Sequence, residues 1–205
     1  MALMLLVVIL LVACKDDCNY QDGCSNINEI NRQVRLGNIV YDYREDFQVI
    51  NKDIYRLNKG EIDARLAEAG LSYLEILSSS LKGHEDVGLI KYRGRDYPSF
   101  IHATVVDSKF VKIMDLEFLQ DKLLEELRAA LPKDAQGLEE GLGLVRGEEL
   151  PYLSYSSRAE GGQELKSARS FFIVEDKLYA FTLTTSQENF EEDEAYFREV
   201  LASIE

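Results

Sequence analysis

The chain has 205 residues, of which 46% are hydrophobic and 29% charged, and its 37 acidic and 23 basic side chains give a formal net charge of −14. This hydrophobic content excludes an intrinsically disordered chain, and the length suits one domain that buries roughly 70% of its unfolded surface. Phosphate backbones and anionic lipids repel so acidic a surface, so we expect no nucleic-acid partner and no membrane attachment through charge.

Residues 1–13, MALMLLVVILLVA, form an apolar, uncharged leader. A helix of that length reaches roughly 20 Å, less than the ~30 Å hydrocarbon core, so we expect a signal peptide rather than a spanning helix. Leu11-Val12-Ala13-Cys14 resembles the cleavage box of bacterial lipoproteins. This resemblance implies cleavage before Cys14 and a lipid with fatty acids such as palmitate on its sulfur. An ordinary secretory signal and a buried strand are the alternatives, and the leader lacks the Lys or Arg that usually precedes the apolar core.

The lipoprotein resemblance also implies a location, namely a bacterial cell membrane with the domain facing the periplasm or the exterior. Lys15 stands where enteric lipoproteins of the inner membrane have an aspartate, which favours the outer membrane in a cell with two. Cys18 and Cys24 then form an even pair in an oxidising compartment, which predicts a small disulfide loop. Half of a zinc site and a pair of free thiols are the alternatives.

Apolar periodicity divides the rest of the chain into a polar tether, residues 14–36, and a single domain, residues 37–205. The domain is predicted to contain, in chain order, strands at 38–44 and 47–51, a helix at 61–81, a hairpin of 87–93 with 99–107, a helix at 115–131, strands at 142–146, 152–157, 165–174 and 178–185, and a helix at 187–204.

The first two helices are predicted from apolar side chains at three- and four-residue steps. In Glu61–Leu81, Gly70 costs about 1 kcal/mol relative to Ala and marks a kink or a break. Asp115–Leu131 has a leucine stripe, can be capped by Asp115 and ends before Pro132.

The last helix has an apolar stripe that includes Phe197, and we expect it to pack with the 115–131 helix on one antiparallel sheet. Thr185 and Glu188, at its start, have the spacing of a capping box. The acidic run Glu191–Glu194 is favoured near the positive end of the helix dipole, and we interpret it as a solvated first turn rather than as a metal site.

The C-terminal part of the chain carries a family resemblance. Glu148–Tyr152 resembles a turn into a strand, 165-LKSARSFFIVEDKLYAFTLTTS-186 a long hairpin, and 188-ENFEEDEAYFREVLASIE-205 a final acidic-then-apolar helix of the PsbP-like fold. Photosystem extrinsic PsbP proteins and DcrB-type bacterial lipoproteins share this fold. The resemblance covers roughly residues 38–205 and implies an α+β domain, an antiparallel sheet sandwiched between helices. It implies no activity and no functional residue, since the fold serves diverse roles.

The sequence predicts no catalytic, cofactor-binding or metal-binding residue. His84 and His102 lack zinc spacing, and His102 is expected to be a hydrogen-bonded residue of the sheet. There is no G-x-S-x-G motif. Gly141-Leu142-Gly143 with Gly147 lacks the remainder of a nucleotide loop, so these glycines are interpreted as turns between strands. Ser78-Ser79-Ser80 is interpreted as a helix end rather than as a nucleophile.

Two classes of function are compatible with these features. The sequence favours a lipid-anchored envelope protein with a non-catalytic interaction or assembly module and a protein partner, and therefore not an enzyme. The alternative is a periplasmic or surface enzyme, or a small-ligand-binding protein, whose site is assembled from scattered residues. A deep pocket with convergent His102, Arg or Tyr side chains would favour the alternative, and a flat sheet face with exposed aromatic residues would favour the interaction module.

Overall fold

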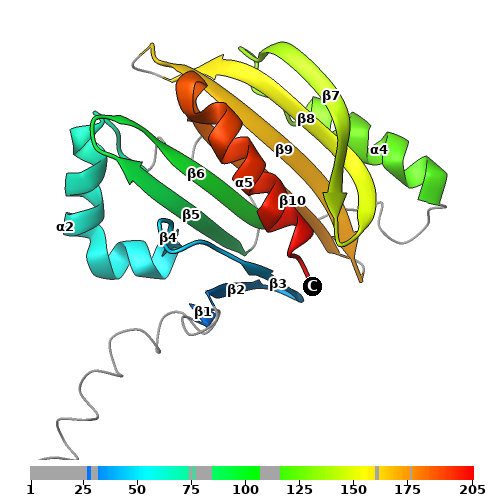
Figure 1. Cartoon of the computed structure of the whole chain (residues 1–205), viewed down its shortest axis with the longest axis horizontal. Helices are drawn as coiled ribbons and strands as arrows, with labels where there is room; N and C mark the ends of the chain where they lie inside the picture. The colour runs from blue at the N-terminus through cyan, green and yellow to red at the C-terminus, as the bar shows by residue number, and fades with distance from the viewer. Residues whose placement is uncertain are drawn as a thin grey trace, which may run out of the picture.

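Figure 1 shows the computed structural model, which describes residues 27–28, 32–73, 76, 85–106, 116–159, 162–175 and 177–205. Within these residues the fold is mixed α+β, with a large antiparallel sheet and a few helices, as predicted. The leader at 1–13, the three cysteines and the expected cap at Asp115 lie outside the described residues.

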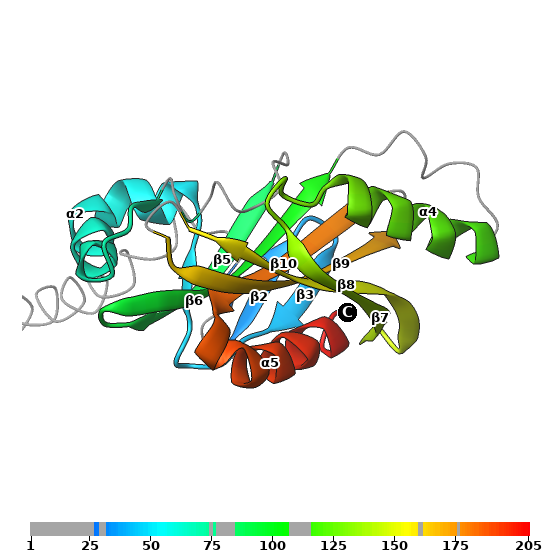
Figure 2. The ribbon, with the colours of Figure 1, turned by 90° about the horizontal axis from the view of Figure 1, so that it is seen from above.

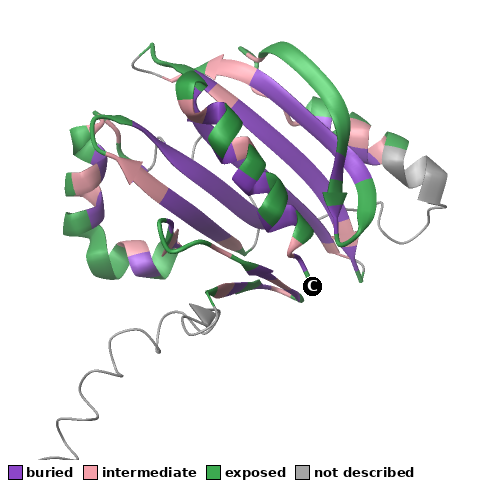
Figure 3. Cartoon of the chain, in the orientation of Figure 1, coloured by how far each residue is buried: buried purple, intermediate pink, exposed green. Residues whose placement is uncertain are grey.

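The large sheet contains seven of the described strands, all antiparallel to their neighbours. In spatial order they are β4 (Gln48–Ile50), β5 (Asp86–Arg93), β6 (Asp96–Val106), β10 (Lys177–Ser186), β9 (Glu164–Val174), β8 (Glu148–Arg158) and β7 (Gln136–Val145). The two predicted hairpins are confirmed, because β5 pairs with β6 and the whole length of β10 pairs with β9. Strands β6, β9 and β10 are mostly buried and β8 is buried in its middle, whereas β7 is exposed over most of its length (Figure 3).

Strand β7 differs from its prediction, since it begins at Gln136 and not at Leu142. The interpretation of the glycines as turns was therefore wrong for Gly141 and Gly143, which lie inside the strand. Gly147 does lie in the turn to β8, with a φ of 81° that favours glycine.

A smaller sheet is formed by β1 (Ile27–Asn28), β2 (Gln33–Leu36) and β3 (Ile39–Asp42). Its second strand lies in the segment that the sequence assigned to the tether. Val34 and Leu36 are buried there, and β2 pairs with β3. Backbone hydrogen bonds also join Val40 in β3 to Glu205 at the other end of the chain. Residues 33–36 therefore belong to the folded domain, and the boundary expected at residue 37 was too late.

One face of the large sheet is covered by α5 (Phe190–Ala202) together with β2 and β3 (Figure 2). A short 3₁₀ turn, Gln187–Asn189, leads into α5. The predicted apolar stripe of this helix is confirmed, because Phe197, Val200 and Leu201 are buried in the same cluster as the facing side chains of the sheet.

The opposite face is contacted by α2 (Lys52–Glu68) and α4 (Leu116–Ala129) over different strands (Figure 2). Leu123 and Leu127 of α4 pack with Leu153 and Phe171, while Phe172, the next residue of β9, belongs to the cluster on the α5 side. Successive residues of a strand point to opposite faces, so α4 and α5 pack on one sheet from its two sides.

Helix α2 begins nine residues earlier than predicted, and its first turn explains why. The Asn51 side-chain oxygen accepts hydrogen bonds from the backbone N–H groups of Asp53 and Ile54, at 3.0 and 2.8 Å, which is the standard N-cap arrangement. The helix ends at Glu68, just before Gly70, whose φ is 71°, so the predicted break at Gly70 is confirmed. The expected stretch to Leu81 lies largely outside the described residues.

Candidate functional site

Cys14, Cys18 and Cys24 lie outside the described residues, as do His84 and Ser78–Ser80. None of the described helices is long and apolar enough to cross a membrane. The described residues also contain no group of three or more His, Cys, Asp or Glu side chains arranged to hold a metal ion.

His102 lies in β6, as predicted, but it is not hydrogen-bonded as predicted. Its side chain is buried, and neither ring nitrogen has a hydrogen-bond partner among the residues that the structure describes. The register places Thr182 beside it, but the Thr182 hydroxyl accepts from Nε of Arg169 instead. The Asp86 carboxylate lies 3.6 Å from Nε2 of His102, too long for a good hydrogen bond but close enough for the imidazole to hold the pKa of Asp86 below its usual value.

Arg169, in β9, is a buried cation that sequence reasoning missed. Its guanidinium donates to the Thr182 hydroxyl at 3.1 Å and to the Ala130 carbonyl at 2.6 Å, and it lies 5.6 Å over the ring of Tyr155. No carboxylate among the described residues forms an ion pair with it. Burial therefore lowers the pKa of the guanidinium, although an arginine remains charged. Its neutral partners and its place at the end of α4 indicate that it holds α4 on the sheet.

The acidic run at the start of α5 contains a buried member, so its interpretation as a solvated turn was wrong for Asp193. This side chain is 1% exposed, and its carboxylate accepts from Arg93, Ser99 and Thr185. The expected capping box was also wrong, because the Thr185 hydroxyl donates to Asp193 and the start of the helix shows no side-chain cap. Asp193 therefore joins α5 to β6 and β10.

The edge strand β7 carries an unusual apolar surface, made of Leu138, Leu142 and Leu144. These side chains are 42%, 54% and 52% exposed, and with Leu57 they are the large exposed hydrophobic residues of the described part of the chain. Gly143 and Val145 point to the α5 side, where Val145 joins the core, so Leu142 and Leu144 point to the α4 side. The ion pair between Arg128 of α4 and Glu140 of β7 agrees with this orientation.

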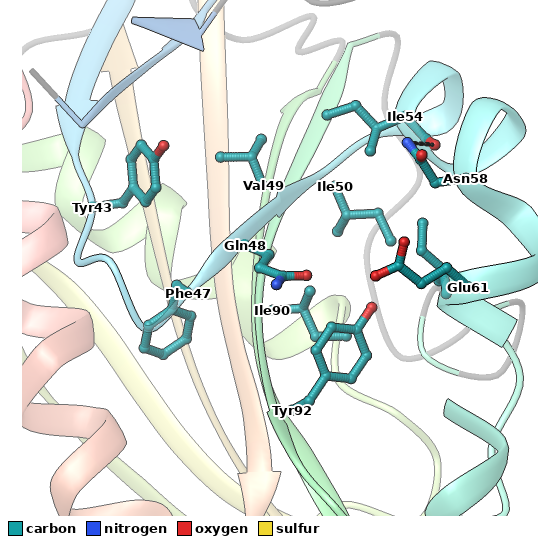
Figure 4. A pocket seen from close by; sticks show the side chains of 11 residues that line it. Tyr43, Phe47, Gln48, Val49, Ile50, Ile54, Asn58, Glu61, Ile90 and Tyr92 are labelled. Atoms are coloured by element: carbon teal, nitrogen blue, oxygen red, sulfur yellow. Dashed lines mark hydrogen bonds between the residues drawn. The ribbon is translucent and has the colours of Figure 1, made fainter. Parts of the chain in front are cut away.

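A cavity of about 260 Å³ lies at the other end of the sheet, between α2, β4 and β5 (Figure 4). Isoleucines from all three elements form its apolar walls: Ile54 and Ile62 from α2, Ile50 from β4 and Ile90 from β5. Tyr43 and Tyr92 also line it, whereas His102 and the arginines do not.

The polar side chains that line this cavity are Gln48, Asn58, Glu61 and the two tyrosines. Arg65 stands beside them, since its guanidinium donates to Glu61 at 2.7 Å and lies 5.2 Å from the centre of the Tyr92 ring. Burial raises the pKa of the Tyr92 phenol, so the phenol stays protonated at neutral pH. Isoleucines thus line one part of the cavity, and the polar part combines the Glu61 carboxylate, which only accepts, with the Gln48 and Asn58 amides and the Tyr92 hydroxyl, which can donate and accept (Figure 4).

No family model and no curated protein matches this chain. Among solved structures, a protein of unknown function from Pseudomonas aeruginosa, PA94, has 13% sequence identity and a TM-score of 0.43, over 60% of this chain and 84% of that one. Cyanobacterial PsbP (CyanoP) from Synechocystis sp. PCC 6803 has 12% identity and a TM-score of 0.41, over 88% of this chain and 89% of that one. Similarities of this degree indicate neither a ligand nor a partner.

Proposed function

We propose that the chain is a lipid-anchored envelope protein whose domain is a non-catalytic interaction or assembly module. In this proposal Cys14 carries the lipid after removal of residues 1–13, and the domain is a PsbP-like sheet with helices on both faces. The protein is held on a bacterial membrane, facing the periplasm or the exterior, and on the outer membrane where there are two. The domain binds an extended segment of a partner protein at β7.

The observation that carries the docking proposal is the exposure of Leu138, Leu142 and Leu144 on an edge strand. Within the described sheet β7 pairs only with β8, so its other edge presents unpaired backbone groups. Proteins usually protect such edges with charged side chains, prolines, β-bulges or very short strands. Strand β7 has ten residues and no lysine or proline, and its two glutamates and its register shift lie before Leu142. A strand of a partner can pair with this edge and cover the leucines.

The charges around β7 select the chemistry of the partner. The run Gln136–Leu150 contains four glutamates and one arginine, and the whole chain has a formal net charge of −14. The side chain of Glu139 is 71% exposed, and Glu148 and Glu149 are exposed at the start of β8. A partner segment in which apolar residues alternate with Lys or Arg complements both the leucines and the carboxylates.

Site-specific photocrosslinking tests the docking proposal, with a benzophenone amino acid placed at Leu142 in the full-length protein in its own cells. Leu57 provides a matched control, since it is an exposed leucine of α2, and α2 packs on β4 and β5, at the end of the sheet order opposite to β7. We expect an adduct at Leu142, with no such adduct at Leu57, and we expect its crosslinked peptide to alternate apolar and basic residues.

Other outcomes contradict this proposal. An adduct of the chain with a second copy of itself would make β7 a dimer interface, and a crosslinked peptide rich in acidic residues would contradict the charge argument. Equal labelling at Leu142 and Leu57 would show that exposed leucines of this chain crosslink nonspecifically. As a second measurement, L142K should abolish crosslinking from a probe at Leu144, because a lysine interrupts the apolar surface of β7, while L57K should leave this crosslinking unchanged.

A further inference from the structure

We propose that the cavity between α2, β4 and β5 binds a small primary amine with an apolar body. This site is separate from the β7 edge, because β4 and β7 are the two terminal strands of the described sheet. Its failure would therefore leave the docking proposal standing.

The apolar walls set the nature of the ligand body. Ile54 and Ile62 of α2 line the cavity together with Ile50 and Ile90 of the sheet, and all four side chains are buried in one hydrophobic cluster. A cavity lined by such groups favours an apolar occupant, because apolar surface gains free energy when it leaves water. At about 30 Å³ for each water-sized group, 260 Å³ holds on the order of nine such groups, which is enough room for the seven non-hydrogen atoms of a six-carbon amine.

The shape of α2 keeps the cavity open. Asn58, one of the lining residues, has φ −114° and ψ 22°, so the helix is kinked at this position. Its side-chain amide donates to the Ile54 carbonyl at 3.1 Å, a backbone acceptor four residues earlier. A side chain that bonds into the hydrogen-bond ladder of a helix can kink it, and this kink changes the direction of α2 close to its isoleucines.

The polar side of the cavity sets the nature of the head group. Glu61 supplies a carboxylate and Asn58 an amide whose nitrogen already donates to Ile54, while Arg65 is the one cation seen on Gln48 and Glu61 among the described residues. Arg65 occupies only Oε1 of Glu61, at 2.7 Å. Nearby, Lys59 is paired with Asp63. A carboxylate ligand would lie beside the negative charge of Glu61, whereas an ammonium group supplies three donors and the opposite charge to the second oxygen of Glu61.

Titration calorimetry of the full chain with three six-carbon probes tests this inference. Hexylamine, hexan-1-ol and hexanoate share one apolar body and differ in head group. We expect hexylamine to bind most tightly and hexanoate most weakly. E61Q should weaken hexylamine binding by about tenfold at low ionic strength and leave hexan-1-ol nearly unchanged, because it removes the charge on which the ammonium depends. E68Q removes the same charge from the end of the same helix, outside the cavity, and should change neither.

Two further results decide the location and the specificity. I90F should abolish binding of all three probes by filling the cavity, and its melting curve will show whether the domain still folds. If I90F does not fold, E61Q decides the test, because the Glu61 side chain is 64% exposed and its replacement should not unfold the domain. Equal affinity for hexylamine and hexanoate, no binding of any probe, or the same loss from E68Q as from E61Q would overturn the proposal.

Discussion

Replacing Asp193 with alanine should lower the free energy of unfolding by about 3 kcal/mol. The buried carboxylate accepts from Arg93 at 2.8 Å and from the hydroxyls of Ser99 and Thr185, so the substitution leaves three donors without their acceptor. Removing one partner of a buried ion pair costs about 3–5 kcal/mol. We expect the lower end of that range, because the Arg93 side chain is 16% exposed and Glu192 lies 3.8 Å from it.

Urea denaturation of the full chain measures this effect, with E191A as the matched control. Glu191 is an exposed acid in the same first turn of α5, so its loss should change the free energy of unfolding by less than about 0.5 kcal/mol. If D193A and E191A had the same small effect, Asp193 would not join α5 to the sheet.

Replacing Phe197 with alanine should lower the free energy of unfolding by about 3–5 kcal/mol. Phe197 is fully buried between α5 and the sheet, and its ring lies 6.3 Å from that of Tyr152. The substitution removes the ring from this cluster and leaves a cavity that the surrounding strands can fill only in part.

F197L tests whether the loss comes from the missing volume. Leucine keeps much of the apolar side chain, so F197L should be clearly more stable than F197A in the same urea titration. A melting curve of F197A that matched that of the unchanged chain would contradict the placement of α5 on the sheet.

The elements that could be predicted from sequence are those with a local apolar period. Apolar strand-like runs on either side of the short polar turns Gly94–Asp96 and Glu175–Lys177 identified the two hairpins. The stripe of α5 was recognisable for a similar reason, since one side of the helix meets the sheet.

Other elements lack that local signal. The start of α2, Lys52–Gly60, contains one buried residue, Ile54, so the capping by Asn51 and not a stripe determines where the helix begins. Most of β7 is exposed on both faces, and the strand contains Gly141 and Gly143, so its sequence has the composition of a loop. Strand β2 is short, and its apolar residues are buried by partners far along the chain.

The candidate sites depend on long-range packing in the same way. In sequence Asp193 cannot be told from Glu191 and Glu192, and only the seating of α5 over Ser99 and Arg93 buries it. The cavity is lined by residues 43–62 together with Ile90 and Tyr92 of β5, and no spacing along the chain marks them as neighbours. The sequence places His102 correctly in β6. Whether its ring nitrogens find hydrogen-bond partners is decided by the side chains of the neighbouring strands, and among the described residues they find none.

The proposal that the domain is held at a membrane surface depends on lipid attachment at Cys14. The domain's negative charge cannot supply adhesion, and each buried methylene of an acyl chain contributes about 0.8 kcal/mol. Two or three chains therefore anchor a protein stably, whereas one does so only marginally.

Membrane fractionation with intact mass measurement, on the unchanged chain and on C14A expressed side by side in a bacterium, tests this premise. We predict that the unchanged protein sediments with the membranes and carries an acyl mass increment at Cys14, while C14A is recovered in the soluble fraction. Recovery of C14A with the membranes, or an unchanged protein without the acyl increment, would contradict the lipid anchor.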